Sequence, residues 1–163
     1  MKIKLAKKEV IHFIGIGGIG MSGLSLIMKG QGFKVQGSDI TNNKNIERLK
    51  KEKIKIFLGQ LKKNLRNATI VVISSAIKNN NPELIEAKRK KIPIIRRGKM
   101  LASIVSLMKN IVVVGSHGKT TTTSLIASIF QETKIDPTII NGGVINSIEN
   151  TAKLGKSDWS ILE

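Results

Sequence analysis

The chain has 163 residues, 40% of them hydrophobic and only 3% aromatic, with 15 glycines and no cysteine. Its length suits one domain, or one domain with part of another, and the lack of cysteine excludes disulfides and thiolate metal sites. The net charge of +17 lies in residues 1–107, which carry 23 Lys and Arg against 6 Asp and Glu. These cations are mostly Lys among Asn and Ile, without neighbouring aromatic residues to stack on bases, so we expect no nucleic-acid partner.

Short runs rich in Ile and Val alternate with helix-patterned, Lys-rich stretches through the first hundred residues. This alternation is typical of βαβ units and predicts an α/β fold with a parallel sheet. The predicted strands are 9–15, 33–39, 54–59, 68–76 and 92–97. The predicted helices are 19–30, 43–53, 81–91 and 98–110, and the third has Asn81 as its N-cap and Pro82 at its first position.

A second module follows, and its charges balance, with 5 basic and 5 acidic residues in 108–163. We predict strands at 111–115, 137–141 and 158–163 and a helix at 119–133. The boundary is expected near residue 107, which gives a Rossmann-like domain at 1–107 and the beginning of a P-loop-type ATPase domain at 108–163. Because the last predicted strand runs to the final residue, we expect this second domain to be truncated.

Residues 10–28 contain no formal charge and follow a Lys-rich start, as a signal sequence or a membrane span does. Five of these 19 residues are glycine, however, and no small-residue cleavage site follows. The glycines are better explained by a ligand-binding loop. We therefore expect a cytoplasmic protein without a membrane partner.

The first glycine-rich motif is GIGGIG, residues 15–20, between the first predicted strand and the first helix. Gly15, Gly17 and Gly20 satisfy the pattern G-x-G-x-x-G, in which glycines permit a tight turn, close approach to a pyrophosphate and close helix packing. Asp39 ends the second strand, where an acidic side chain accepts hydrogen bonds from ribose hydroxyls. Motif, context and acid together predict a nucleotide or dinucleotide site.

The second motif, VVGSHGKTTTTSLIA (112–126), departs from the usual P-loop because only two residues separate Gly115 from Gly118. Its glycines leave backbone N–H groups open to a triphosphate, and Lys119 is placed to meet the β- and γ-phosphate oxygens. Thr120 offers its hydroxyl to Mg²⁺. A dehydrogenase would need only the first motif and a simple ATPase only the second, whereas an enzyme that uses ATP to activate a nucleotide-linked substrate needs both.

Two histidines lack Cys, Asp or Glu neighbours in the sequence, so they do not predict a metal site. We expect His12 to be a packed strand residue and His117 to shape the second loop.

The motifs IHFIGIGGIGMSGL, GSD, SSAI, NPE, IIRR with ML, VVGSHGKTTTT and DPT…NGG occur in an order that resembles the Mur ligase family, and within it the UDP-N-acetylmuramate–L-alanine ligases of peptidoglycan synthesis. Family members are several hundred residues long and have three domains. The resemblance therefore implies that this chain covers the N-terminal UDP-substrate domain and the start of the central ATPase domain, without the C-terminal domain that binds L-alanine.

The resemblance also implies site residues. The family reaction phosphorylates the muramoyl carboxylate with ATP and Mg²⁺, and the amine of L-alanine attacks the resulting acyl phosphate. The UDP-N-acetylmuramate site would comprise Gly15, Gly17, Gly18, Ile19, Gly20, Ser38, Asp39, Ser74, Ser75 and Ala76. The ATP site would comprise Gly115, Ser116, His117, Gly118, Lys119, Thr120 and Thr121. Lys119 and Thr120 would be catalytic, and Thr120 and Glu163 would support Mg²⁺.

The sequence departs from the family at Gln60, where members often have His, and at Lys99, where they have Glu. We expect the 163-residue chain alone not to catalyse ligation. Three alternatives remain: the related ligase that recycles muropeptides, a regulatory module that binds NAD without catalysis, and a degraded or truncated gene product. The Gly-Lys-Thr of 118–120 counts against the NAD module, which has no use for it.

Overall fold

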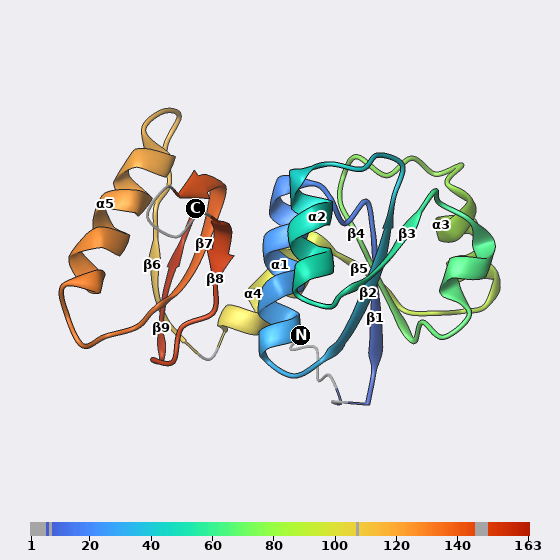
Figure 1. Ribbon diagram of the computed structural model, residues 1–163, viewed down its shortest axis with the longest axis horizontal. Coiled ribbons are helices and arrows are strands. Elements are labelled where there is room, and N and C mark those ends of the chain that lie inside the picture. The colour runs from blue at the N-terminus through green and yellow to red at the C-terminus, as the bar shows by residue number, and fades with distance from the viewer. Residues whose placement is uncertain (1–5, 7, 107, 146–149) are drawn as a thin grey trace. The chain divides into compact units, whose positions relative to one another are not determined.

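A computed structural model describes residues 6, 8–106, 108–145 and 150–163. The chain divides into two compact units, Met1–Ser103 and Ile104–Glu163. The division falls a few residues before the boundary expected from charge balance. Each unit is an α/β structure with its own sheet (Figure 1).

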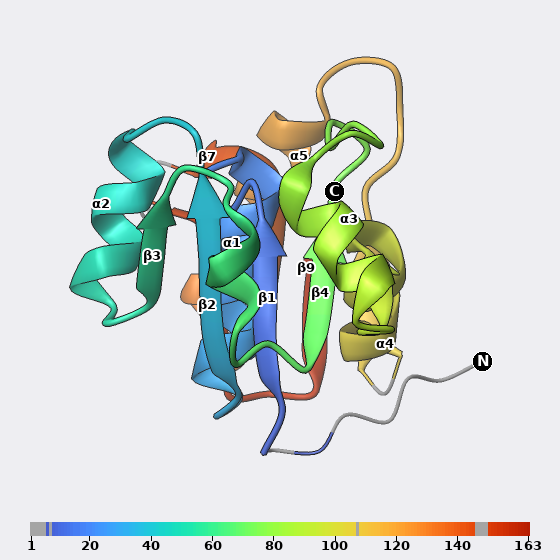
Figure 2. The same ribbon diagram turned by 90° about the vertical axis from the view of Figure 1, so that its right-hand side faces the viewer.

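The first unit contains a five-stranded sheet in the order β3-β2-β1-β4-β5, and every neighbouring pair is parallel. Figure 2 shows β3, β2, β1 and β4 side by side in this order. The strands are β1 (Val10–Ile14), β2 (Lys34–Asp39), β3 (Lys55–Leu58), β4 (Ile70–Ile73) and β5 (Ile94–Arg96). This is the strand order of a Rossmann-like half sheet, which confirms the predicted fold class.

Helices cover both faces of this sheet, with α1 and α2 on one face and α3 on the other (Figure 1). The helical elements are α1 (Ile19–Gly30), α2 (Lys44–Lys51), the 3₁₀ turn η1 (Lys62–Leu65), α3 (Pro82–Arg89) and α4 (Arg97–Val105). Because both faces are covered, β1 and β4 are almost wholly apolar: Ile11, Phe13 and Ile14 of β1 have no exposed surface. On the α3 face, Ile14 packs with Leu65, Val71, Leu84 and Ala87.

The predicted cap of α3 is confirmed. The Asn81 side chain accepts hydrogen bonds from the backbone N–H groups of Glu83 and Leu84, both at 3.0 Å, and Pro82 opens the helix. Asn43 caps α2 in the same way through Ile46 N–H. These caps satisfy N–H groups that the first helical turn cannot pair internally, so they fix where each helix begins.

The second unit contains a four-stranded sheet in the order β6-β9-β7-β8, in which only the β7–β8 pair is antiparallel. The strands are β6 (Lys109–Val112), β7 (Thr138–Ile145), β8 (Asn150–Lys153) and β9 (Trp159–Leu162). Helix α5 (Lys119–Gln131) packs Ala127 against Ile139 and Ile161. None of the helices in the described ranges is long and apolar enough to cross a membrane.

Several predicted segments differ from the structure in their extent, among them the two at the domain boundary, and strand β8 is missing from the predictions. The helix expected at 98–110 ends at Val105, and the strand expected at 111–115 is instead Lys109–Val112. Residues after Val112 leave the sheet because they form the loop before α5. Strand β8, with the sequence NTAK, was not predicted because it lacks the apolar alternation of a half-buried strand.

Glu86 of α3 leads to a prediction about pH. Hydrogen bonds from Arg89, at 2.7 and 2.8 Å, together with the charges of Arg89 and Lys90, lower the pKa of Glu86 from 4.5 to about 2. A lowered folded-state pKa adds stability above the unfolded pKa, and this stability is lost as the pH falls through the range between the two values. We therefore expect Glu86→Gln to be less stable than the wild type near neutral pH, and the gap to shrink as the pH falls below 4.5.

Urea unfolding of both proteins across this pH range measures the gap. Glu52→Gln is the control, because Glu52 lies at the end of α2 and its carboxylate forms no ion pair within the described residues. A gap of constant size at every pH would contradict the prediction.

Candidate functional site

The first glycine loop connects β1 to α1 and is fixed on the carboxyl end of β2. The N–H groups of Gly15 and Ile16 both donate to the carbonyl oxygen of Ser38, at 2.8 and 2.9 Å. Gly15 has a φ of +76°, which favours glycine, and Gly18 N–H donates back to Gly15 O at 3.2 Å. The loop is therefore a tight turn that ends at the N-terminus of α1, where helices bind anions.

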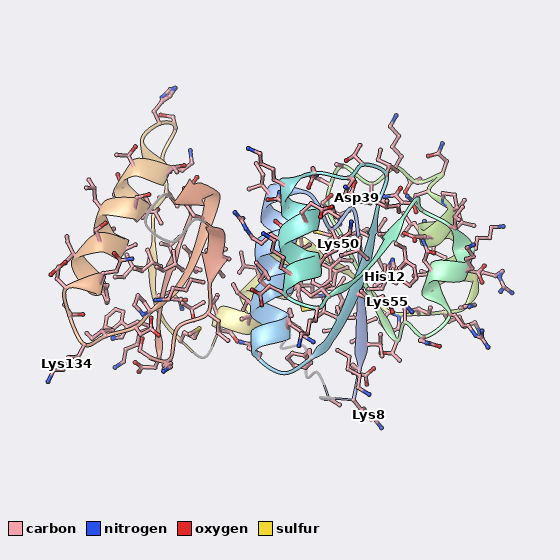
Figure 3. All side chains as sticks on the ribbon, viewed as in Figure 1. Lys8, His12, Asp39, Lys50, Lys55 and Lys134 are labelled. Atoms are coloured by element: carbon pink, nitrogen blue, oxygen red, sulfur yellow. The ribbon has the colours of Figure 1, made fainter. Side chains whose placement is uncertain are left out.

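Both carboxylate oxygens of Asp39, which is labelled in Figure 3, accept hydrogen bonds from backbone N–H groups of the chain. Its Oδ2 accepts a hydrogen bond from Gly17 N–H at 2.8 Å, and its Oδ1 accepts one from Thr41 N–H at 3.1 Å. A Cβ on Gly17 would lie 2.9 Å from Asp39 Oδ2, so the close contact requires glycine at this position. Asp39 therefore supports the loop, and its predicted contact with a ribose stays a prediction.

Ser38 was expected to contribute to the UDP-N-acetylmuramate site, but the structure gives its side chain a different environment. Its hydroxyl is fully buried and donates to Glu83 Oε2 at 2.5 Å, so only its backbone carbonyl reaches the glycine loop. Residues 74–76 directly follow β4, and Ser75 and Ala76 are exposed. The loops after β1, β2 and β4 thus meet at one edge of the sheet, which is where open α/β sheets bind ligands.

Arg97 is a residue that the sequence reasoning missed. It follows β5 directly, it is exposed, and a Cβ on Gly20 would lie 2.8 Å from its Nη1. No carboxylate in the described ranges lies within ion-pair distance of its guanidinium. The signal was present in the IIRR motif, whose second arginine comes after a strand that ends at the same edge as the glycine loop. Arg97 thus adds a positive charge to the positive end of α1.

The second loop connects β6 to α5. Val113 N–H still donates to Leu162 O at 2.8 Å, after which the chain turns, and Gly118 with a φ of +75° caps α5. Lys119 Nζ donates to the carbonyl oxygens of Gly115, at 2.7 Å, and Ser116, at 3.4 Å. The lysine therefore folds back over its own loop, with residues 115–118 exposed around it.

The structure brings together the two residues predicted to support Mg²⁺. Thr120 Oγ1 donates to Glu163 Oε1 at 3.1 Å, although 43 residues separate them. The other carboxylate oxygen, Oε2, is buried and has no hydrogen-bond partner in the described part of the chain. Hydroxyl and carboxylate oxygens fit Mg²⁺, which binds few protein groups and takes its remaining ligands from phosphate and water. No group of three or more His, Cys, Asp and Glu gathers among the described residues.

His12 is a packed strand residue, as expected, whereas the expected role of His117 in shaping the second loop stays a prediction. His12 is fully buried in β1, within the first sheet (Figure 3). His117 is exposed in the second loop, next to Gly118.

Known proteins resemble the chain along its whole length. A model of the Mur ligase family, catalytic domain, matches residues 10–109. A UDP-N-acetylmuramate–L-alanine ligase of Pelagibacter ubique (strain HTCC1062) is 77% identical over 100% of this chain and 35% of that protein. The enzyme of the same name from Rickettsia prowazekii (strain Madrid E) is 57% identical over 94% of this chain and 31% of that protein.

Solved structures agree with these relatives. The UDP-N-acetylmuramate–alanine ligase of Thermotoga maritima gives a TM-score of 0.88 at 30% identity, over 93% of this chain and 36% of that one. A UDP-N-acetylmuramate:L-alanyl-γ-D-glutamyl-meso-diaminopimelate ligase of Neisseria meningitides gives a TM-score of 0.89 at 27% identity. This match covers 96% of this chain and 52% of that one. The chain spans about a third of the length of the curated relatives it matches. The family model covers more than half of the chain, and the chain therefore belongs to the Mur ligase family.

Proposed function

We propose that this chain provides the UDP-substrate module and part of the ATP site of an ADP-forming ligase that joins L-alanine to UDP-N-acetylmuramate. The observation that carries the proposal is the second loop, in which Lys119 lies on an exposed turn and Thr120 contacts Glu163. A module that only binds NAD has no use for this arrangement. Relatives that carry the name UDP-N-acetylmuramate–L-alanine ligase at 77% and 57% identity support the choice of substrates.

The first loop would hold the diphosphate of UDP-N-acetylmuramate. The N-terminus of α1 and the guanidinium of Arg97 lie at Gly20, so backbone dipoles and a formal charge act on the same position. Asp39 and the Ser38 carbonyl hold Gly15, Ile16 and Gly17 in place before any ligand arrives. The exposed Ser75 and Ala76 would line the same edge.

The second loop would hold the triphosphate of ATP. Lys119 would exchange the carbonyl oxygens of Gly115 and Ser116 for phosphate oxygens and stabilise charge on the transferred phosphoryl group. Thr120 and Glu163 would hold Mg²⁺, which offsets phosphate charge when bound. In the proposed reaction a muramoyl carboxylate oxygen attacks the γ-phosphorus and ADP leaves. The amine of L-alanine then displaces phosphate from the acyl phosphate, and the product is an amide. A reaction on these metabolites belongs to the cytoplasm.

A second candidate is the ligase that attaches a recycled muropeptide to UDP-N-acetylmuramate. The fold match to the Neisseria meningitides enzyme, with a TM-score of 0.89, favours it as strongly as the Thermotoga maritima match favours the first. The 77% and 57% identity to relatives named UDP-N-acetylmuramate–L-alanine ligase supports the first candidate over the second. Both candidates share the UDP substrate and differ in the amine that attacks.

Calorimetric titration of the chain with UDP-N-acetylmuramate, UDP and NAD tests the proposal. We expect the two uridine ligands to bind and NAD not to bind. Arg97→Ala should weaken UDP binding about tenfold, which corresponds to the loss of about 1.4 kcal/mol from a charge-assisted contact.

Lys99→Ala is the matched control, since Lys99 is an exposed cation of the same helix α4 and should leave the affinity unchanged. Binding of NAD alone would overturn the proposed function. Equal losses from both variants would show that Arg97 acts only through net charge.

A further inference from the structure

Five polar side chains are buried together between the first sheet and the elements that cover its α3 face. They come from β1, β2, η1 and the first turn of α3, and none is more than 7% exposed: His12, Gln36, Ser38, Asn64 and Glu83. We call them the Glu83 network. Burying a carboxylate and four polar groups brings little net stability compared with an apolar core of the same volume. Their presence therefore calls for a role other than packing.

Glu83 is the centre of this network. Its Oε2 accepts a hydrogen bond from the Ser38 hydroxyl at 2.5 Å, and its Oε1 accepts one from Asn64 Nδ2 at 2.7 Å. His12 Nε2 lies 3.4 Å from the same Oε2. The carboxylate thus faces three polar groups from three elements that are far apart in the sequence.

The hydrogen-bond partners fix the proton on His12. Gln36 Nε2 lies 3.0 Å from the carbonyl oxygen of Asn64, which only accepts, so the atom there must be the amide nitrogen. The same nitrogen lies 3.1 Å from His12 Nδ1, which must therefore be unprotonated. The neutral imidazole consequently carries its proton on Nε2, the atom that faces Glu83. This nitrogen lies 3.4 Å from Glu83 Oε2 and has no hydrogen-bond partner among the described residues, whereas Ser38 and Asn64 each donate to Glu83.

The network reaches the surface at two loops. Through Ser38, whose carbonyl accepts from Gly15 and Ile16 N–H, it holds the glycine loop. Through Asn64, whose Nδ2 also donates to Gly59 O at 2.9 Å, it holds the turn after β3, where Gly59 has a φ of +86°. Both loops follow strands whose carboxyl ends form the proposed UDP-substrate edge.

We propose that Glu83 is a positioning residue, which sets the glycine loop and the Gly59 turn for the UDP ligand through Ser38 and Asn64. This inference rests on the proposed function only for the identity of the ligand. Replacing Glu83 by Gln keeps the volume but turns one acceptor into a donor. Since Asn64 and Ser38 donate to different carboxylate oxygens, the new amide leaves one of these two donors without its acceptor.

Amide hydrogen exchange measured by NMR tests the positioning without any ligand. We expect Glu83→Gln and Ser38→Ala to speed exchange of the Gly15 and Ile16 amides at least about tenfold, because these two amides are held through Ser38. In the wild type, imidazole ¹⁵N shifts should show His12 as the Nε2–H tautomer. The matched control is Glu86→Gln, which removes a carboxylate one turn further along α3 and breaks its ion pair with Arg89. This control variant should leave the exchange rates of both loop amides unchanged.

Titration with UDP then connects the positioning to function. Glu83→Gln should weaken UDP binding at least about tenfold, and should weaken it much less when Ser38 is already Ala, as expected for residues that act in series. The inference would be overturned if the Gly15 and Ile16 amides exchange at the wild-type rate in Glu83→Gln. It would also be overturned if the losses of UDP affinity simply add in the double variant. If wild-type protein binds no UDP, the proposed function fails, whereas the exchange result still decides the role of Glu83.

Discussion

Replacement of Lys119 by methionine is expected to weaken the binding of Mg·ATP about 10- to 100-fold. The expected loss is about 1.5–3 kcal/mol, the contribution of a hydrogen bond to a charged partner. Methionine keeps most of the side-chain length but cannot donate to phosphate oxygens. Among the described residues, Lys119 Nζ donates to the carbonyl oxygens of Gly115 and Ser116, and both of these residues are exposed. The free energy of unfolding should therefore change by less than about 0.5 kcal/mol, as for other surface substitutions.

Equilibrium binding of a fluorescent ATP analogue, with and without Mg²⁺, measures the effect. Lys134→Met is the control, because Lys134 is an exposed lysine of the same unit that lies beyond the end of α5 (Figure 3). If both variants bind Mg·ATP as the wild type does, Lys119 has no role in phosphate binding and the ATP half of the proposed function fails.

The sequence predicted best those parts of the structure that depend on local chemistry. Helix α1 begins and ends where the pattern placed it, at Ile19 and Gly30, because glycines and a strand bound it on the N-terminal side. The two loops were found for the same reason: Gly15 and Gly118 adopt positive φ values that few other residues tolerate. The alternation of strands and helices likewise indicated a parallel sheet, which the first unit contains.

The sequence could not predict which side chains meet across the fold. Asp39 was expected to face a ligand, yet its carboxylate accepts the Gly17 N–H, since the glycine lies within reach once β2 is paired with β1. Glu83 and its four partners come from four separate elements, and their spacing carries no periodic signal. The pairing of Thr120 with Glu163 was anticipated only from the family resemblance, and the parallel alignment of β6, β9 and β7 brings those two residues together.

The second large effect is expected at Asp39, where asparagine should impair both stability and UDP binding. Both carboxylate oxygens accept hydrogen bonds from backbone N–H groups, one from Gly17 and one from Thr41. Asparagine offers one acceptor oxygen and one NH₂ group, so one N–H must face another donor. Asp39 is only 7% exposed, and an unsatisfied group there costs about 1–3 kcal/mol.

If the amide NH₂ group faces Gly17 N–H, the glycine loop loses the hydrogen bond that fixes it at the position where the diphosphate is proposed to bind. UDP affinity should then fall at least about tenfold beyond any loss due to unfolding, a difference of about 1.4 kcal/mol. Urea unfolding and UDP titration of the same preparation separate the two effects.

Glu47→Gln is the matched control, because Glu47 is an exposed carboxylate of α2 whose partner is Lys50, at 2.9 Å. A surface ion pair of this kind contributes at most about 1 kcal/mol, so this variant should bind UDP normally. An Asp39→Asn protein that is destabilised but binds UDP normally would show that the carboxylate supports the fold alone. A protein that is equally stable but binds UDP weakly would instead place Asp39 in direct contact with the ligand, as its position after β2 first suggested.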